Sequence, residues 1–228
     1  MIKRELYMNR IRPFIGGELI KVMTGIRRSG KSVMLELIKE ELAEAGVAPS
    51  QMISINFEDM RYSHLQTATA LHDEIIKRAE GIEGKAYLFF DEIQEVEGWE
   101  KCVNSLRVAL DCDIYITGSN AKLLSGELAT YIGGRYVEFV IYPFSFAEFL
   151  ELYHTIAPSD SIQQCFQKYL LAGGMPYLAN LRYEEEPSRQ YLTDLFNSVQ
   201  LKDIVKRNKI RDIDLLERII AYMTANVG

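Results

Sequence analysis

The sequence predicts an α/β fold, in which a five-stranded parallel sheet carries helices on both faces and a small all-helical subdomain follows. Along residues 1–150, five short apolar segments alternate with segments of helical periodicity. The connections between successive apolar segments are long enough to hold a helix, which favours parallel strands. Over residues 151–228 only helical periodicity remains. We therefore expect a core over residues 1–150 and a helical lid or linker over residues 151–228.

Strands are expected where the apolar segments lie, and helices where apolar residues recur three and four positions apart. The expected strands cover residues 19–24, 52–57, 86–90, 113–117 and 136–142. The expected helices cover residues 31–45, 71–79, 99–110, 121–131, 162–171, 188–206 and 213–225. Turn-rich stretches at 157–160, 173–176 and 184–187 separate the later helices. The last helix stops without a polar tail, which suggests a fragment of a longer protein.

Composition restricts the class of protein. The 228 residues are 48% hydrophobic and 25% charged, with a formal net charge of −6, which excludes disorder or a coiled coil as a description of the whole chain. No secretory signal and no run of about 18 apolar residues occurs, so we expect a cytoplasmic protein without membrane contact. The acidic balance argues against general electrostatic binding of nucleic acid, but a local basic face can occur within an acidic total, so composition leaves a nucleic-acid partner open. The basic stretch at 201–211 favours a solvated helix end over a nucleic-acid contact.

A phosphate-binding loop is predicted between the first strand and the first helix. Residues 25–32 read GIRRSGKS, which is the P-loop pattern of glycine, four residues, glycine, lysine and serine. The glycines would let backbone N–H groups point at a phosphate, Lys31 would bridge the β- and γ-phosphates of ATP, and the Ser32 hydroxyl would bind Mg²⁺. The alternative is a structural glycine turn, and two arginines of the loop could instead be solvated or contact a partner. The expected nucleotide-binding residues here are Gly25, Ile26, Arg27, Arg28, Ser29, Gly30, Lys31, Ser32 and Val33.

Two acidic residues follow the third strand. Asp91 and Glu92 end the apolar run YLFF, where Asp91 would hold Mg²⁺ and Glu92 would polarise the attacking water. Such a pair is more often a solvated strand end, but a P-loop in the same parallel sheet favours the catalytic interpretation. Ser119 and Asn120 follow the fourth strand and would face the γ-phosphate, with a capping or turn role as the alternative.

Arg135 precedes the fifth strand, and we expect it at the end of the sheet opposite the nucleotide of its own chain. In a ring or filament that edge would face the site of a neighbouring copy, where an arginine acts as a finger in trans. The alternative is an ordinary surface arginine beside two glycines. A finger role for Arg135 would therefore require a homo-oligomer, and we include a second copy of the chain among the expected partners.

Several strings taken together resemble a known family. They are LIKVMTGIRRSGKS, LFFDEIQ followed by Trp99, YITGSN, GGRYVEFVIYPFSFAEF and YLLAGGMPYL. Together they resemble the prokaryotic AAA-type ATPase domains of the ASCE class of P-loop proteins, known as archaeal-ATPase-like ATP-binding proteins, in which a helical lid and a C-terminal domain of unknown function follow the ATPase core. The resemblance implies Walker A, Walker B, sensor and finger roles for Lys31 and Ser32, Asp91 and Glu92, Asn120, and Arg135, respectively.

The resemblance extends to the helical part. In related signal-transduction ATPases a Gly-x-Pro element of the lid touches the adenine, and residues 174–176 read Gly-Met-Pro. This similarity implies that Pro176 contacts the nucleotide. It also implies that the C-terminal domain of the family lies beyond residue 228.

The expected function is Mg²⁺-dependent ATP hydrolysis that drives a conformational change in an unidentified protein partner or in the absent C-terminal domain. The alternative is a slow nucleotide-gated switch, in which binding rather than turnover is the function. A small-molecule kinase shares the loop but usually has an arginine-rich lid, and the stretch after Pro143 offers mainly Phe, Glu and Tyr.

Overall fold

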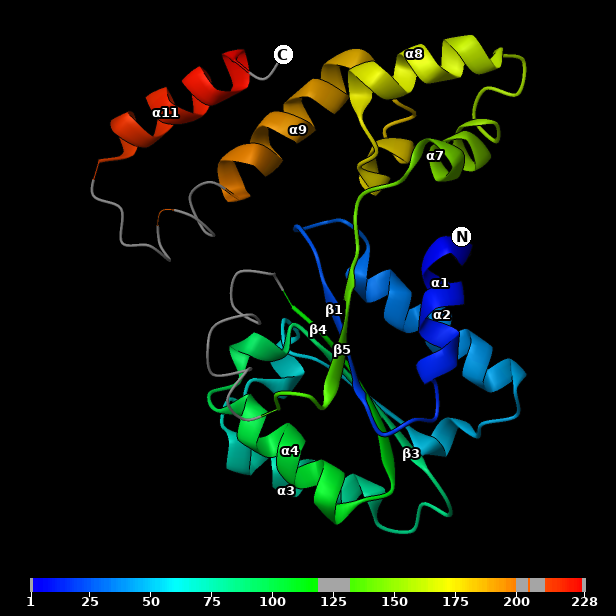
Figure 1. Cartoon of the computed structure of the whole chain (residues 1–228), viewed down its shortest axis with the longest axis vertical. Coiled ribbons are helices and arrows are strands. Elements are labelled where there is room, and N and C mark those ends of the chain that lie inside the picture. Colours follow the sequence, from blue (N-terminus) through cyan, green and yellow to red (C-terminus); the bar gives the residue numbers. More distant parts are fainter. Residues whose placement is uncertain (1, 119–131, 200–204, 206–211, 227–228) are drawn as a thin grey trace. The chain divides into compact units, whose positions relative to one another are not determined.

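The chain forms two units that are joined at residues 177 and 178. A computed structural model describes residues 2–118, 132–199, 205 and 212–226 (Figure 1). The units are Met1–Tyr177, which holds the sheet, and Leu178–Gly228, which is helical in its described part. The helices α7 (Phe146–Tyr153) and α8 (Ile162–Ala172) belong to the first unit. The expected division at residue 150 stays a prediction about functional domains.

The first unit is built on a five-stranded parallel sheet. Its strands are β1 (Ile20–Thr24), β2 (Met52–Asn56), β3 (Ala86–Asp91), β4 (Cys112–Thr117) and β5 (Tyr136–Val140). They lie in the order β2-β3-β4-β1-β5, and all four pairings are parallel. This confirms the predicted α/β fold, and β4 separates the strands that carry the loop and the acidic pair.

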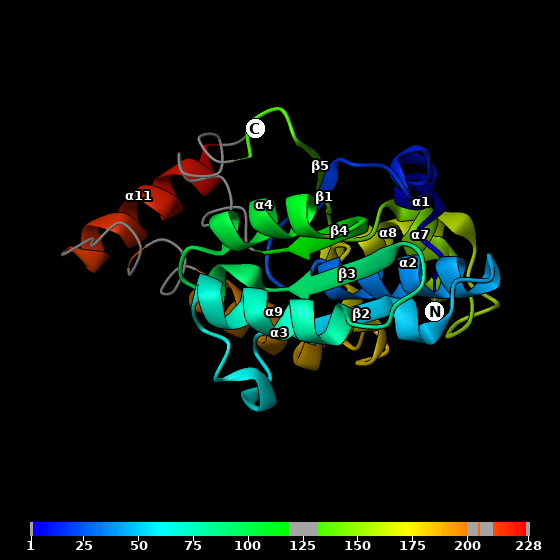
Figure 2. The ribbon, with the colours of Figure 1, turned by 90° about the horizontal axis from the view of Figure 1, so that it is seen from below.

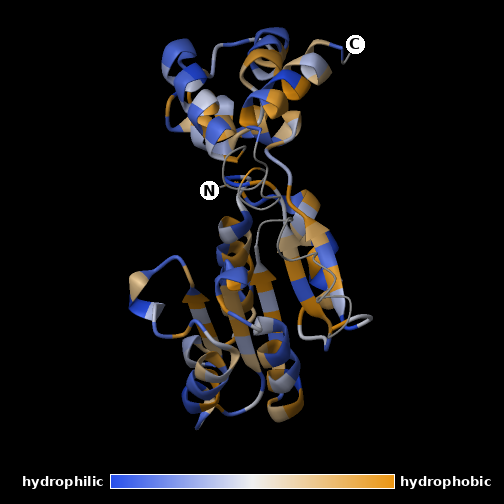
Figure 3. Cartoon of the chain, turned by 90° about the vertical axis from the view of Figure 1, so that its left-hand side faces the viewer, coloured by the Kyte–Doolittle hydropathy of each residue, from blue (hydrophilic) through white to orange (hydrophobic). Residues whose placement is uncertain are grey.

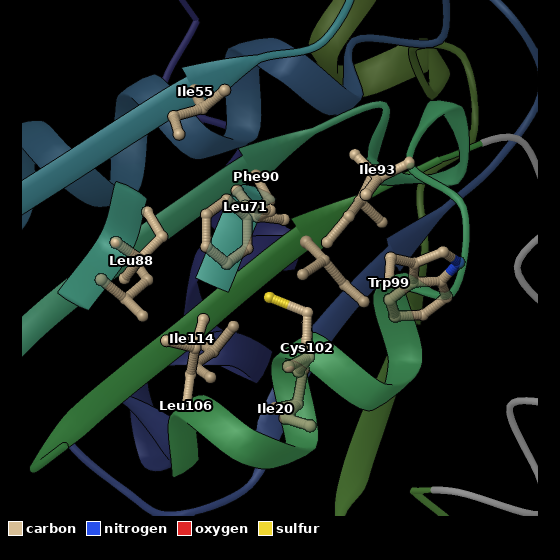
Figure 4. Packing of buried hydrophobic residues seen from close by; sticks show 14 of the residues in the cluster. Ile20, Ile55, Leu71, Leu88, Phe90, Ile93, Trp99, Cys102, Leu106 and Ile114 are labelled. Atoms are coloured by element: carbon tan, nitrogen blue, oxygen red, sulfur yellow. The ribbon is translucent and has the colours of Figure 1, made fainter. Parts of the chain in front are cut away.

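Helices cover both faces of the sheet, because alternate strand residues point to opposite sides and both sides are apolar. The helices α1 (Glu5–Ile11) and α2 (Lys31–Glu44) pack on one face, and α3 (Ala68–Ala79) and α4 (Trp99–Ala109) pack on the other (Figures 1 and 2). Figure 4 shows the second face, where Trp99, Cys102 and Leu106 of α4 meet strand residues. The helices carry hydrophobic and hydrophilic stripes in Figure 3, as amphipathic helices on a sheet do.

Several predicted helices need correction. The sequence analysis missed α1 and α7, which are short, with 7 and 8 residues. A turn at 184–187 was wrong, because α9 (Glu185–Val199) begins there and proline is tolerated in the first turn of a helix. The final helix α11 (Ile213–Ala225) has the predicted bounds. The helix predicted at 121–131 and the basic stretch at 201–211, except residue 205, lie outside the described residues. Within the described residues, no helix has the length and apolar character that a membrane span requires.

A buried ion pair connects the amino ends of β1 and β4. Lys21 and Asp113 are both fully buried, and the Lys21 ammonium donates to Asp113 Oδ1. The other carboxylate oxygen accepts hydrogen bonds from the Gly16 N–H and the Tyr115 hydroxyl, each at 2.7 Å. Burial lowers the pKa of Lys21, although the neighbouring carboxylate opposes this shift. The pair thus satisfies two charges that would otherwise be buried alone at the edge of the sheet opposite the P-loop.

Candidate functional site

The P-loop and the two acidic residues of the predicted site meet at the carboxyl edge of the sheet. Residues 25–30 connect the end of β1 to the start of α2, and Asp91 is the last residue of β3. Thr117 is the last residue of β4, the strand between them. Because the strands are parallel, their carboxyl ends lie at one edge, which is where α/β proteins bind ligands.

The backbone of the loop requires glycine at its two ends. Gly25 has φ +144°, and a Cβ atom there would lie 2.2 Å from the carbonyl oxygen of Ile141. Gly30 has φ +100° and precedes the first residue of α2. Arg28 between them also has a positive φ, of 65°. The loop is therefore pressed against the chain that follows β5 and turns its backbone at the N-terminus of α2.

Gly25→Ala tests this close approach. We expect the substitution to lower the free energy of unfolding by at least about 2 kcal/mol, because it adds an overlap with the Ile141 carbonyl to the strain of a positive φ. The matched control is Gly134→Ala, where φ is +74° but nothing lies within 4 Å of the added atom. We expect about 1 kcal/mol for the control, measured by urea unfolding. Equal losses in the two variants would contradict the proposed overlap.

Lys31 lies under the loop. Its side chain is buried, and Nζ donates hydrogen bonds to the carbonyl oxygens of Gly25 and Ile26, both at 3.2 Å. The same ammonium lies 3.9 Å from Oε1 of Glu92. The P-loop lysine and the second acidic residue, which are far apart in sequence, are thus brought into one site.

Ser29 of the loop fits a phosphate group. The Oγ atom of Ser29 is buried and has no hydrogen-bond partner in the described part of the chain. Such an orphaned polar atom, in a loop at a helix N-terminus, matches the acceptor oxygens of a phosphate. Ser32 and Val33 in the first turn of α2 are exposed, as are Ile26 and Arg28 in the loop, whereas Arg27 is half-buried.

Asp91 is held by residues of both neighbouring strands. The Thr117 hydroxyl of β4 donates to one of its carboxylate oxygens, and the Asn56 side-chain amide of β2 donates to the other at 3.1 Å. Sequence analysis missed Asn56 and did not assign Thr117 to the site. Thr117 ends a predicted strand and Asn56 lies one residue before the end of another, which was an available signal, but the order of strands in the sheet was needed to bring them to Asp91.

Glu92 adopts a backbone conformation that is uncommon for a residue with a side chain. Its φ is 56°, which lies in the left-handed region. This conformation costs a non-glycine residue about 1–3 kcal/mol, and residues that adopt it cluster at functional sites. Its N–H donates to Oγ1 of Thr117 at 3.0 Å, and its carboxylate accepts a hydrogen bond from the side chain of Gln94. These contacts hold the carboxylate on the side of the lysine.

Other predicted residues lie elsewhere. Arg135 precedes β5, its carbonyl accepts from the N–H of Ile20 at 3.0 Å, and its exposed guanidinium donates to Oδ1 of Asn104 at 2.7 Å. It therefore lies at the amino edge of the sheet, away from Lys31. Pro176 begins the short helix η5 (Pro176–Ala179) and is half-buried. Ser119 and Asn120 lie outside the described residues, so their expected roles stay predictions.

Comparison with known proteins agrees with this geometry. Residues 18–150 match the model of a family described as "AAA domain". The chain belongs to this AAA family. Residues 163–228 match a second model, described as "Domain of unknown function (DUF8612)". The expected family, an AAA-type ATPase with a C-terminal domain of unknown function, is thereby confirmed, and membership indicates nucleotide binding. The matched C-terminal domain falls within residues 163–228, where the sequence analysis expected the lid, whereas that analysis placed the domain beyond residue 228.

Relatives of this AAA protein include longer chains. An uncharacterized protein of Haemophilus influenzae is 40% identical over 229 residues, covering all of this chain and 56% of the relative. The uncharacterized protein MJ1544 of Methanocaldococcus jannaschii is 33% identical over 219 residues, covering 91% of this chain and 47% of the relative. The chain thus spans about half the length of these relatives. AMPPCP-bound DnaA from Aquifex aeolicus shares the fold, with a TM-score of 0.50 and 14% identity over 99% of this chain and 70% of DnaA.

Proposed function

We propose that the chain binds ATP with Mg²⁺ at the carboxyl edge of the sheet and hydrolyses it. The observation that carries this proposal is the meeting of Lys31, which the P-loop encloses, with Glu92, 3.9 Å away. A buried lysine under a glycine-gated loop is suited to phosphate, and a carboxylate beside it is suited to a reacting water.

The metal would be held by Ser32 and Asp91. The hydroxyl of Ser32 is exposed at the start of α2, and the Asp91 carboxylate ends β3. When bound, Mg²⁺ neutralises charge on the β- and γ-phosphates. Thr117 and Asn56 fix the orientation of the carboxylate by donating to its two oxygens.

Glu92 would act as the general base. Its carboxylate would accept a hydrogen bond from the attacking water and orient it toward the γ-phosphate. The ammonium of Lys31 would exchange its contacts with the Gly25 and Ile26 carbonyls for phosphate oxygens. These roles need no change in the strand positions, because both side chains already lie at one edge of the sheet.

Hydrolysis would be coupled to a conformational change in a protein partner or in the part of the longer protein beyond this chain. A second copy of the chain is a further proposed partner, with Arg135 as a finger in trans. The exposure of its guanidinium at the amino edge of the sheet supports this role. Contact of Pro176 with the nucleotide and a cytoplasmic location remain part of the proposal.

Lys31→Met tests nucleotide binding directly. We expect binding of a fluorescent ATP analogue with Mg²⁺ to weaken about 10- to 100-fold, because hydrogen bonds to a charged group contribute about 1.5–3 kcal/mol. The matched control is Lys39→Met on the same helix, where the ammonium pairs with Glu36 at 2.6 Å. We expect its affinity to equal that of the wild type. Unchanged affinity in Lys31→Met would refute the proposed phosphate site.

A further inference from the structure

One buried arginine contacts both the P-loop and the chain that follows β5. Arg4 precedes α1 and is 2% exposed. Its Nη1 donates to the carbonyl oxygen of Ser29 at 2.9 Å, inside the P-loop. Its Nη2 donates to the carbonyl oxygen of Tyr142 at 2.8 Å, and its Nε donates to Oε1 of Glu148 at 2.8 Å. A single guanidinium therefore joins segments that are separated by more than 100 residues.

Glu148, the carboxylate that binds Arg4, also caps α7. Glu148 accepts hydrogen bonds from the N–H and the hydroxyl of Ser145, at 2.8 and 3.0 Å. Its own N–H donates to Oγ of Ser145 at 3.4 Å, which completes the capping box of the helix. Burial opposes its ionisation, but the hydrogen bonds from Arg4 and Ser145 prevail and lower the pKa of Glu148. The charge that caps α7 is thus the charge that holds Arg4.

The contacts continue beyond α7. The guanidinium lies 5.2 Å from the ring centre of Phe144. The N–H of Phe144 donates to the carbonyl oxygen of Gly174 at 2.7 Å, and the Tyr169 hydroxyl donates to the carbonyl oxygen of Phe144 at 2.9 Å. A Cβ atom at Gly174 would lie 2.1 Å from that same oxygen. A continuous chain of contacts therefore runs from Ser29 through Arg4 to Gly174, which precedes Met175 and Pro176.

The backbone at Arg4 is constrained in support of this contact. Its φ is 49°, in the left-handed region, and its carbonyl oxygen accepts from the N–H groups of Tyr7 and Met8. Non-glycine residues persist in this region where the surrounding structure over-determines them. Arginine also offers five donors in a fixed plane, which lysine cannot reproduce. The site thus uses the geometry of the guanidinium as well as its charge.

We propose that Arg4 is a positioning residue that couples nucleotide occupancy of the P-loop to the segment from Tyr142 to the start of α7. Phosphate binding acts on the loop backbone around Ser29, and the loop carbonyl is bonded to Arg4. A shift of the Ser29 carbonyl therefore moves the guanidinium that donates to Tyr142 and Glu148. This inference rests on the proposed nucleotide binding and adds a path by which binding is transmitted.

The test compares hydrogen exchange with and without AMPPCP and Mg²⁺ in the wild type, Arg4→Lys and Arg12→Lys. In the wild type we expect nucleotide to slow exchange of the amides of residues 144–149 about fivefold or more, as is typical of coupled sites. Arg4→Lys should still bind nucleotide, about tenfold more weakly, but should lose this slowing at saturating nucleotide. Arg12→Lys is the matched control, because Arg12 forks onto Glu41 and Glu5 outside the P-loop. It should keep the wild-type response.

The outcomes separate the two proposals. Absence of AMPPCP binding in the wild type would overturn nucleotide binding and this inference with it. Binding without a change at residues 144–149, or an unchanged response in Arg4→Lys, would overturn the coupling alone. If Arg4→Lys does not fold, Glu148→Gln replaces it, since glutamine keeps an acceptor but removes the charge. A merely structural role of Arg4 would change exchange equally with and without nucleotide.

Discussion

Glu92→Gln is expected to reduce ATP turnover about 100- to 10,000-fold while ATP binding is retained, because a positioned acid or base contributes a factor of this size. The amide has nearly the shape of the carboxylate but cannot accept a proton from water. The backbone N–H of residue 92 can still donate to the Thr117 hydroxyl, and the new side chain still offers an oxygen to the Gln94 amide. The loss should therefore fall on the chemical step.

The measurement is steady-state phosphate release together with affinity for a fluorescent ATP analogue. Glu97→Gln is the matched control, since its side chain is exposed and lies five residues further along the chain. We expect control turnover equal to that of the wild type. If Glu92→Gln binds ATP and turns it over at the wild-type rate, Glu92 is not the base. If the wild type itself binds ATP but shows no turnover, the nucleotide-gated switch is favoured instead.

Lys21→Met is expected to lower the free energy of unfolding by about 3–5 kcal/mol, because removing one partner of a buried ion pair leaves the other charge uncompensated. Lys21 and Asp113 are both fully buried, so the stranded group would be the Asp113 carboxylate.

The chain offers a matched control in Lys85→Met. Lys85 and Asp111 form a second lysine–aspartate pair at 2.7 Å near the starts of β3 and β4, but their side chains are 28% and 68% exposed. We expect a loss of about 0–1 kcal/mol there, as for surface pairs. Urea unfolding of both variants gives the comparison. Similar losses in the two variants would show that burial of the first pair does not determine its contribution.

Local sequence patterns predicted the sheet well. The five strands differ from the predicted segments by only one or two residues at an end, because apolar runs bounded by glycine or charge are properties of adjacent residues. The short helices α1 and α7 were missed because 7 or 8 residues give little periodicity. In α7, the capping box of Ser145 and Glu148 was the available signal.

Part of the candidate site could likewise be predicted from the sequence, and part could not. The P-loop motif marked Lys31 and Ser32, and the end of an apolar run marked Asp91 and Glu92, because each motif lies within a few consecutive residues. The structure adds Asn56 and Thr117, which reach Asp91 from two different strands. No pattern along the chain states which strands will be neighbours.

The sequence by itself determined the fold class, the strand positions and the residues of the two motifs. Only the tertiary structure decided how its buried charges are compensated. Arg4 pairs with Glu148, 144 positions away, and Lys21 pairs with Asp113, 92 positions away. The physical reason is that secondary structure follows from neighbours a few residues apart, whereas a buried charge needs a partner that only the order of strands and the packing of helices bring into contact.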